Sequence, residues 1–247
     1  MGKIVLYIHG MGGGGDSRIP SILADIFSHP EGSQSHESQS NPDFQCHPER
    51  SEGAAAGKTA EVKIVVRTYD FDPEVAAEQI AGWVEELKPD LVIGESLGSL
   101  QALRIKGVPH LFVSPSLNAP LYFSRLAFLA LVPGVTWILD RIYRPKEGDR
   151  QKLHFTYRVL RKYRKHRKIA LANSTSNGSD EYFYAFFGER DHYRKSGIVS
   201  LKTWEKYFGK TYSVYNGTHF MEDEYVRKML APAVCNVLYN KKKNKNV

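Results

Sequence analysis

The sequence is poor in features that mark several classes of protein. It has two cysteines, Cys46 and Cys235, too few for a disulfide framework and without zinc-site spacing. Its longest uncharged apolar stretch, 126–139, is broken by Pro133 and Gly134, whereas a membrane-spanning helix needs about 20 apolar residues. The N-terminal segment lacks the basic region, long apolar core and cleavage site of a secretory signal, so the cytoplasm is the expected location.

Acidic residues are outnumbered by basic ones, and the excess is local. The formal net charge is +7, and the extra lysines and arginines gather in 158–168 and 241–245. A uniformly basic surface would suggest a nucleic-acid partner. Two clusters on an otherwise balanced chain, without a recognisable recognition fold, do not, so no nucleic-acid partner is expected. Hydrophobic residues make up 42% of the chain and aromatic residues 12%, which favours a globular protein over a disordered one.

Short apolar segments alternate with segments of helical periodicity. The alternation predicts one α/β domain over 1–247, with a mostly parallel sheet of about six strands and helices on both faces. The expected strands are 3–8, 61–68, 91–93, 110–113, 182–187 and 211–215. The expected helices are 17–27, 73–87, 97–105 and 221–239.

Two long segments interrupt this alternation. Residues 29–60 are rich in Ser, Gln, Glu, Pro and Gly, and such a segment buries too little apolar surface to offset its ordering entropy. We interpret it as an inserted, mobile loop. Residues 116–179, between the fourth and fifth strands, are rich in leucine and aromatic residues. Their length and composition predict a helical cap, with a small second subdomain as the alternative.

The pentapeptide Gly94-Glu95-Ser96-Leu97-Gly98 carries the clearest chemical signal. The pattern G-x-S-x-G alone also occurs in ordinary glycine–serine turns. Here it follows an apolar strand and precedes a helix-competent segment, the context in which a strained turn exposes a nucleophilic serine. The helix N-terminus that follows would stabilise developing negative charge.

A second signal is the run of glycines at 10–15 that follows His9 and the first strand. Glycines here let the backbone approach a ligand and turn its N–H groups inward. The run formally matches the dinucleotide pattern G-x-G-x-x-G, but the acidic residue expected about twenty residues later would fall in the 29–60 insert. A Walker A loop is excluded because the Gly-Lys-Ser/Thr ending is absent.

A glycine loop after His9, a G-x-S-x-G turn, and then an acid and a histidine in that order resemble the α/β-hydrolase fold. The resemblance spans nearly the whole chain except 29–60 and the details of the cap. The first strand corresponds to the family's third, as in small minimal bacterial serine esterases. The resemblance implies an acid after the penultimate strand and a histidine after the last strand.

Those two positions point to Asp191 and His219. Glu189 is the alternative acid, and an exposed salt-bridging carboxylate is the structural alternative for either. His192 is the competing histidine, but it directly follows the acid and is poorly placed to reach Ser96 from the opposite loop.

These residues predict a serine hydrolase that cleaves a carboxylic ester or thioester. His219 would take the proton of Ser96, and Asp191 would orient the imidazole. The backbone N–H of Leu97 and, by resemblance, that of Met11 would form the oxyanion hole. No metal or organic cofactor is required. A peptidase or an acyltransferase would use the same acyl-enzyme, and a non-catalytic binding module on this scaffold is the non-enzymatic alternative.

The basic run 158–168 has two interpretations. It is either a solvated helix face or a surface that attracts an anionic substrate, with Arg161, Arg164 and Arg167 as the candidate substrate-binding residues. Phosphate on a coenzyme A thioester, a phospholipid head group and an acidic membrane surface are the anions considered. The expected partner is therefore a small acyl ester or thioester, with membrane-surface contact as an additional option.

Overall fold

The computed structural model describes residues 2–28, 61–143, 147–175 and 182–239. The insert at 29–60 and the basic cluster at 241–245 lie outside the described residues, so the interpretations placed on them stay predictions.

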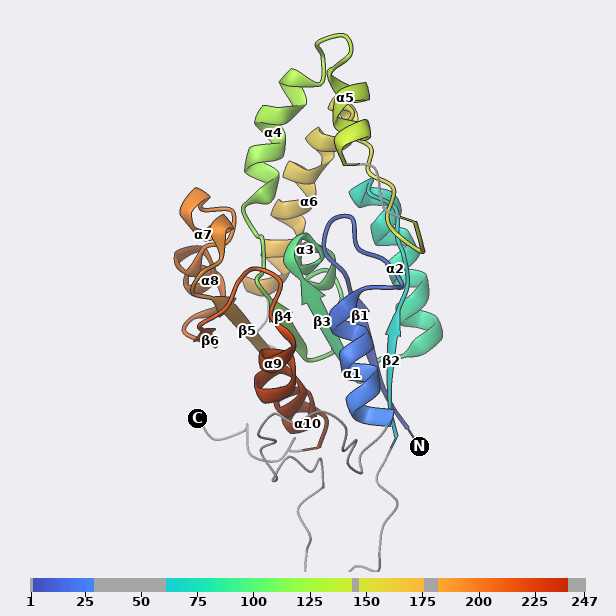
Figure 1. The fold of residues 1–247 in the computed structure, drawn as a ribbon, viewed down its shortest axis with the longest axis vertical. Helices are drawn as coiled ribbons and strands as arrows, with labels where there is room; N and C mark the ends of the chain where they lie inside the picture. Colours follow the sequence, from blue (N-terminus) through green and yellow to red (C-terminus); the bar gives the residue numbers. More distant parts are fainter. Residues whose placement is uncertain (1, 29–60, 144–146, 176–181, 240–247) are drawn as a thin grey trace, which may run out of the picture.

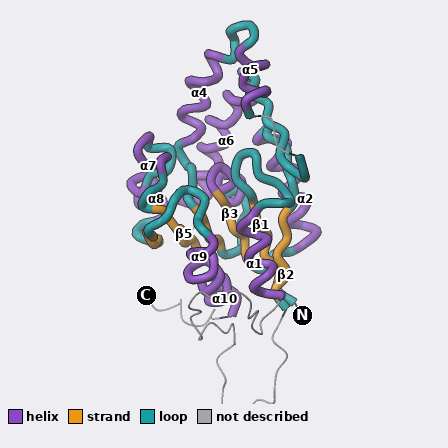
Figure 2. Tube along the Cα trace, in the orientation of Figure 1, coloured by secondary structure: helices purple, strands orange, loops and turns teal. Residues whose placement is uncertain are grey.

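The sheet has six strands, all parallel, in the order β2-β1-β3-β4-β5-β6 (Figures 1 and 2). The predicted fold class is confirmed. Each strand is short and apolar, as expected for strands covered on both faces. The strands are β1 Lys3–Ile8, β2 Val62–Val66, β3 Leu91–Glu95, β4 His110–Val113, β5 Phe183–Gly188 and β6 Tyr212–Tyr215.

Helices follow the strands and cover the sheet on both sides (Figure 1). The helices before β5 are α1 Arg18–Ser28, α2 Pro73–Leu87, η1 Ser96–Gly98, α3 Ser99–Ala102, α4 Ala119–Leu129, α5 Val135–Ile142 and α6 Tyr157–Thr175. After β5 come α7 His192–Ser196, α8 Leu201–Phe208, α9 Asp223–Tyr225, η2 Val226–Leu230 and α10 Ala231–Tyr239. No helix in the described part of the chain is both long and apolar enough to cross a membrane.

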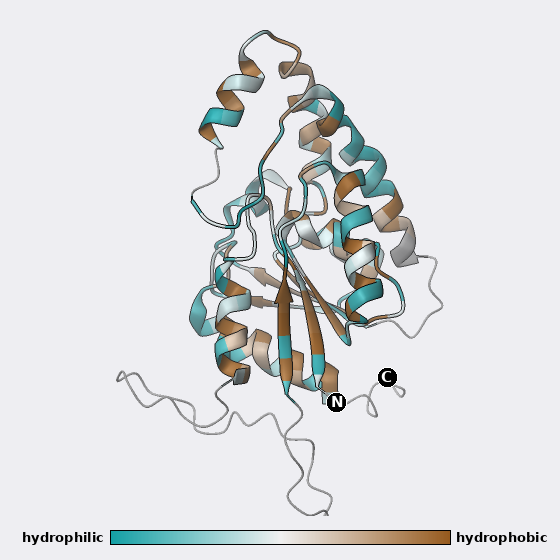
Figure 3. Ribbon diagram, turned by 90° about the vertical axis from the view of Figure 1, so that its right-hand side faces the viewer, coloured by the Kyte–Doolittle hydropathy of each residue, from teal (hydrophilic) through white to brown (hydrophobic). Residues whose placement is uncertain are grey.

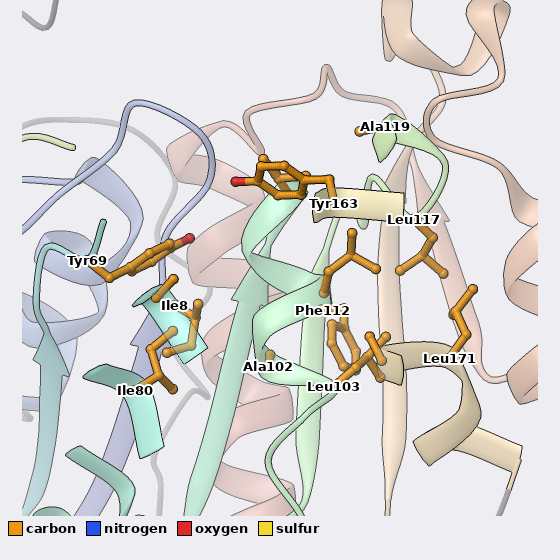
Figure 4. Packing of buried hydrophobic residues seen from close by; sticks show 14 of the residues in the cluster. Ile8, Tyr69, Ile80, Ala102, Leu103, Phe112, Leu117, Ala119, Tyr163 and Leu171 are labelled. Carbon is orange, nitrogen blue, oxygen red and sulfur yellow. The ribbon is translucent and has the colours of Figure 1, made fainter. Parts of the chain in front are cut away.

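Successive residues of each strand enter two different cores, because side chains alternate between the faces of a sheet. Leu6 and Ile8 of β1 pack with α2, α3, α6 and α8 on one face, where Phe112 and Trp204 are fully buried. Figure 4 shows Ile8 and Phe112 among the buried residues of this cluster. Val5 and Tyr7 of β1 pack with α1, η2 and α10 on the other face. This three-layer arrangement holds the carboxyl ends of the strands rigidly at one edge of the sheet.

The segment between β4 and β5 contains α4, α5 and α6. α6 belongs to the main core, because Leu160, Tyr163 and Ala170 are buried against the same cluster as α2 and α3. α4 packs along α6, and α5 has no buried residue. The ribbon extends away from the sheet through α4 and α5 to one end of the molecule (Figure 1). Whether the whole of 116–179 acts as a cap stays a prediction.

Two helices are shorter or less regular than the sequence indicates. The segment expected as one helix at 97–105 is a 3-10 turn followed by the short α3. The expected C-terminal helix at 221–239 is divided by a π-helical stretch, η2, before α10. Pro232 lies in the first turn of α10 and has no N–H, so the ladder of i to i−4 hydrogen bonds is interrupted there.

Candidate active site

The predicted site residues come from loops that follow different strands of the sheet. Ser96 follows β3, Asp191 follows β5 and His219 follows β6. In a parallel sheet these loops all open at the carboxyl edge, which is where open α/β sheets bind ligands. The structure brings the three side chains together, although Ser96 and His219 are 123 positions apart in the sequence.

Ser96 lies in a sharp turn between β3 and η1. Its φ is +48°, in the left-handed region that non-glycine residues seldom adopt. Gly98 makes this turn possible, since a Cβ there would lie 2.2 Å from the carbonyl oxygen of His9. Gly94 is similarly crowded, with a Cβ placed 2.8 Å from that of Ala102. The small residues flanking Ser96 therefore have a steric cause in this fold.

A continuous hydrogen-bonded chain joins the three side chains. His219 Nε2 lies 2.8 Å from Ser96 Oγ, and His219 Nδ1 lies 2.7 Å from Asp191 Oδ2. With Nδ1–H donating to the carboxylate, Nε2 is left to accept the serine proton. Asp191 and His219 are 2% and 3% exposed, so water competes little for these bonds.

Local structure orients the acid and the histidine independently. Asp191 is the N-cap of α7, where its other oxygen, Oδ1, accepts the amide N–H of Tyr193 at 2.8 Å. The loop carrying His219 is held by Glu222, whose Oε1 accepts the amide N–H of Thr218 at 2.9 Å. Each side chain is therefore held in place by its own loop.

The alternative acid and histidine of the sequence analysis, Glu189 and His192, are not part of this hydrogen-bonded chain. Glu189 is exposed, and its described contacts are through the backbone: its N–H donates to the carbonyl oxygen of Tyr215, and its own carbonyl oxygen accepts from Arg194. His192 is also exposed, and its ring centroid lies 6.2 Å from that of His219. The hydrogen-bonded chain runs through Asp191 and His219 instead.

Sequence reasoning missed Ser116, which lies in the loop after β4. Its Oγ is 3.1 Å from Ser96 Oγ, and its amide donates to the carbonyl oxygen of Ser96 at 3.0 Å. Since the Ser96 hydroxyl proton points to His219, Ser116 is the donor in the contact between the two hydroxyls. The sequence marks Ser116 by no motif. The one signal that could have pointed to it is its position shortly after the end of β4.

The glycine loop after β1 is held by a segment from between α5 and α6. The Gln151 side chain, 1% exposed, accepts the amide N–H of Gly12 at 3.1 Å and donates to the carbonyl oxygen of Tyr69 at 3.2 Å. Its own backbone N–H donates to the carbonyl oxygen of Gly13 at 2.7 Å. Met11 and Leu97, whose amides are the predicted oxyanion donors, both line the pocket beside Ser96.

The side chain of His9 holds the start of this glycine loop. Its ring stacks on Tyr69 at a centroid distance of 4.2 Å, and its Nδ1 donates to the carbonyl oxygen of Gly10 at 2.7 Å. Burial lowers the pKa of His9 to about 4, so the ring is neutral at physiological pH. This histidine therefore has a structural reason to precede the glycine run.

The pocket at Ser96 has a volume of about 340 Å³ and walls that are largely apolar. Three charged residues reach it, and each has a partner. Arg18 bonds Asp223 and the carbonyl oxygen of Met221, Arg150 lies 3.2 Å from Asp16, and Glu95 accepts the Tyr7 hydroxyl at 2.9 Å. The apolar lining residues include Met11, Ile19, Leu97, Ala119, Phe123, Ile198 and Phe220.

The three arginines predicted to bind substrate lie on α6 and are not among the pocket-lining residues. Arg167 is committed elsewhere: its Nε donates to the carbonyl oxygen of Leu117 at 2.7 Å and its Nη2 to Asn118 Oδ1 at 2.8 Å. Burial lowers the pKa of Arg167. Arg161 and Arg164 are exposed. Arg18 and Arg150 do line the pocket, but neither belongs to a motif, so the sequence analysis did not find them.

Comparison with known proteins supports the fold. No family model and no curated protein matches the sequence. Among solved structures, a monoacylglycerol lipase from Paleococcus ferrophilus is similar over 97% of this chain and 96% of its own, with a TM-score of 0.57 and 14% identity. A haloalkane dehalogenase from Agrobacterium tumefaciens gives a TM-score of 0.56 and 11% identity over 96% of this chain and 90% of its own. A metagenome-derived lipolytic enzyme gives a TM-score of 0.54 and 13% identity over 95% of this chain and 94% of its own. The chain has the α/β-hydrolase fold.

Proposed function

We propose that this protein is a serine hydrolase that cleaves a carboxylic ester or thioester through an acyl-enzyme on Ser96. The hydrogen-bonded chain from Asp191 through His219 to Ser96 carries the proposal, because its last two members line a pocket. Many chemistries share this fold, so the argument rests on the site. Hydrolytic activity also agrees with the lipase and lipolytic enzyme among the similar structures.

The proposed reaction begins when Ser96 Oγ attacks the acyl carbon while His219 Nε2 accepts its proton. Asp191 holds the Nδ1–H tautomer and stabilises the imidazolium. The amides of Leu97 and Met11 stabilise the oxyanion of the tetrahedral intermediate. His219 then protonates the leaving alcohol or thiol. Attack by water, with His219 again as the base, releases the acid and restores Ser96.

The pocket favours a substrate whose bound part is mainly apolar. Its walls are largely aliphatic and aromatic, and its arginines are paired with acidic side chains. A paired charge offers less to an anionic ligand than a free one. We therefore expect uncharged acyl groups to be accepted in the pocket. A negative charge on the substrate would have to be recognised outside it, where Arg161 and Arg164 are exposed.

The alternatives that share the acyl-enzyme are a peptidase and an acyltransferase, which differ only in leaving group or acceptor. A non-catalytic binding module is the remaining candidate. Nothing in a binding role requires an acid, a histidine and a serine to be hydrogen-bonded in series, so that candidate is disfavoured.

Labelling with a fluorophosphonate probe tests the proposal. Wild-type protein should form a covalent adduct on Ser96, whereas Ser96→Ala and His219→Ala should lose labelling by at least about 10³-fold, as expected for members of one catalytic unit. Ser124→Ala is the matched control, because the Ser124 hydroxyl donates to Pro120 on α4 and lies outside the pocket lining. Equal labelling of Ser96→Ala would refute the assignment. A folded wild type that reacts with neither the probe nor p-nitrophenyl esters would favour the binding module.

A further inference from the structure

The end of the molecule formed by α4, α5 and the turn between them exposes large apolar side chains. We refer to residues 128–142 as the α4–α5 tip. Phe128 and Leu129 end α4 and are more than half exposed, and so are Leu131 and Val132 in the turn. The turn has hydrophobic colouring at the extremity of the ribbon in Figure 3. These are among the most exposed large apolar residues of the described chain.

The helix α5 continues the same apolar surface. Trp137 is 66% exposed and Ile142 is 67% exposed, and Ile138 is about half exposed. No residue of α5 is buried. The helix is nevertheless anchored, because Thr136 Oγ1 donates to the carbonyl oxygen of Ala130 and Asp140 Oδ1 accepts the amide of Phe155. So many exposed large apolar side chains within fifteen residues of chain point to a site of association.

Arginines accompany the exposed aromatic rings. The Arg141 guanidinium lies 5.6 Å from the centre of Trp137, and that of Arg161 lies 5.9 Å from the centre of Phe128. Phe128 also contacts Tyr157, the first residue of α6, so the first turns of the basic run 158–168 lie next to the tip. Within residues 119–143 the sole acidic residue is Asp140. The surface is therefore apolar at its extremity and positively charged behind it.

We propose that the α4–α5 tip docks on the surface of an anionic lipid bilayer. Apolar and aromatic side chains would enter the boundary between head groups and acyl chains, while Arg141, Arg158 and Arg161 would contact lipid phosphates. The charge decides against the competing occupant, a second copy of the chain. A symmetric dimer through this patch would place the same arginines near one another, with Asp140 as the sole acidic residue of 119–143 to offset them. The proposal concerns the surface alone and does not depend on the chemistry at Ser96.

Vesicle binding by the full chain tests the proposal. Co-sedimentation with phosphatidylglycerol–phosphatidylcholine vesicles should exceed that with pure phosphatidylcholine and should weaken with added salt.

Trp137→Ser combined with Ile142→Ser should lower the partition coefficient about ten-fold. The matched control is Val75→Ser combined with Ile169→Ser, which removes exposed apolar residues outside the tip. Arg141→Glu with Arg161→Glu should also weaken binding, in contrast to Lys63→Glu with Lys202→Glu.

Tryptophan fluorescence separates docking from simple attraction of a basic protein to an acidic surface. Trp204 is buried and Trp83 is partly buried, so Trp137 should give the blue shift when vesicles are added, and Trp137→Phe should abolish it. Equal loss of binding in the tip and control variants, or no blue shift, would overturn the proposal. So would light scattering that shows a dimer in solution that the tip variants dissociate.

Discussion

At the scale of the residue, Ser96 is held by two partners at once. Its Oγ lies 2.8 Å from His219 Nε2, and Ser116 donates to the same oxygen at 3.1 Å. Ser116 is 2% exposed, so water cannot easily take its place. The hydroxyl of Ser116 thus restricts the rotation of Ser96, which is already confined by its left-handed backbone conformation.

Replacing this hydroxyl should slow the reaction without abolishing it. Ser116→Ala removes one neutral hydrogen bond, for which a net contribution of about 1 kcal/mol is typical, so the labelling rate should fall about five-fold. The second-order rate constant for the fluorophosphonate measures this, with Ser124→Ala as the control. A loss as large as that in Ser96→Ala would show that Ser116 has a larger role than positioning.

At the scale of the element, the segment leading into α6 fastens the glycine loop. Gln151 joins it to Gly12, Gly13 and the loop after β2, and a bridge pairs Arg150 with Gly14. Gln151 and Gly12 are 139 positions apart, so only the folded chain creates this attachment. The loop that carries the Met11 amide is therefore shaped by the region between β4 and β5.

Removing the Gln151 side chain should affect both stability and reactivity. Gln151→Ala leaves buried polar groups of the glycine loop without their partner, which costs about 1–3 kcal/mol in the free energy of unfolding. The less ordered loop should also slow labelling of Ser96. Urea unfolding and labelling rates measure the two effects, and Lys152→Ala, at the exposed neighbouring position, is the control. Unchanged values for both would contradict the fastening role of Gln151.

At the scale of the whole molecule, three histidines besides His219 are buried: His9, His110 and His166. Burial lowers the pKa of His9 and of His110 to about 4, and burial together with the nearby charge of Arg104 lowers that of His166 to about 3. The unfolded chain, with histidine pKa values near 6.5, binds more protons than the folded chain below about pH 6.5. The free energy of unfolding should therefore fall as the pH drops from about 6.5 to about 4.

Each histidine should contribute about 1–2 kcal/mol to the loss between about pH 7 and about pH 5. Urea midpoints at these two pH values measure it. His110→Phe, which preserves the ring stacking with Phe112 and Phe183, should show a smaller decrease than the wild type. His154→Gln, at an exposed position, should behave as the wild type does. A pH dependence that is identical in all three proteins would contradict the argument.

The sequence by itself determined the parallel α/β architecture and the positions of the main candidates. Strand alternation and the small residues around Ser96 reflect local packing rules, which operate within a few residues of chain. Asp191 and His219 could be located because the resemblance to the α/β-hydrolase fold implies an acid after the penultimate strand and a histidine after the last strand. These three residues were found by position, and their catalytic roles remain a proposal.

Only the tertiary structure decided which distant groups meet. Ser116 reaches Ser96, and Gln151 holds the glycine loop, through contacts that leave no pattern in the sequence. The sequence grouped Arg161 and Arg167 in one basic run, yet in the folded chain Arg167 bonds the carbonyl oxygen of Leu117 whereas Arg161 lies against the exposed ring of Phe128. The physical reason is that periodicity reports which residues share a face, whereas neighbours across elements depend on how whole layers pack.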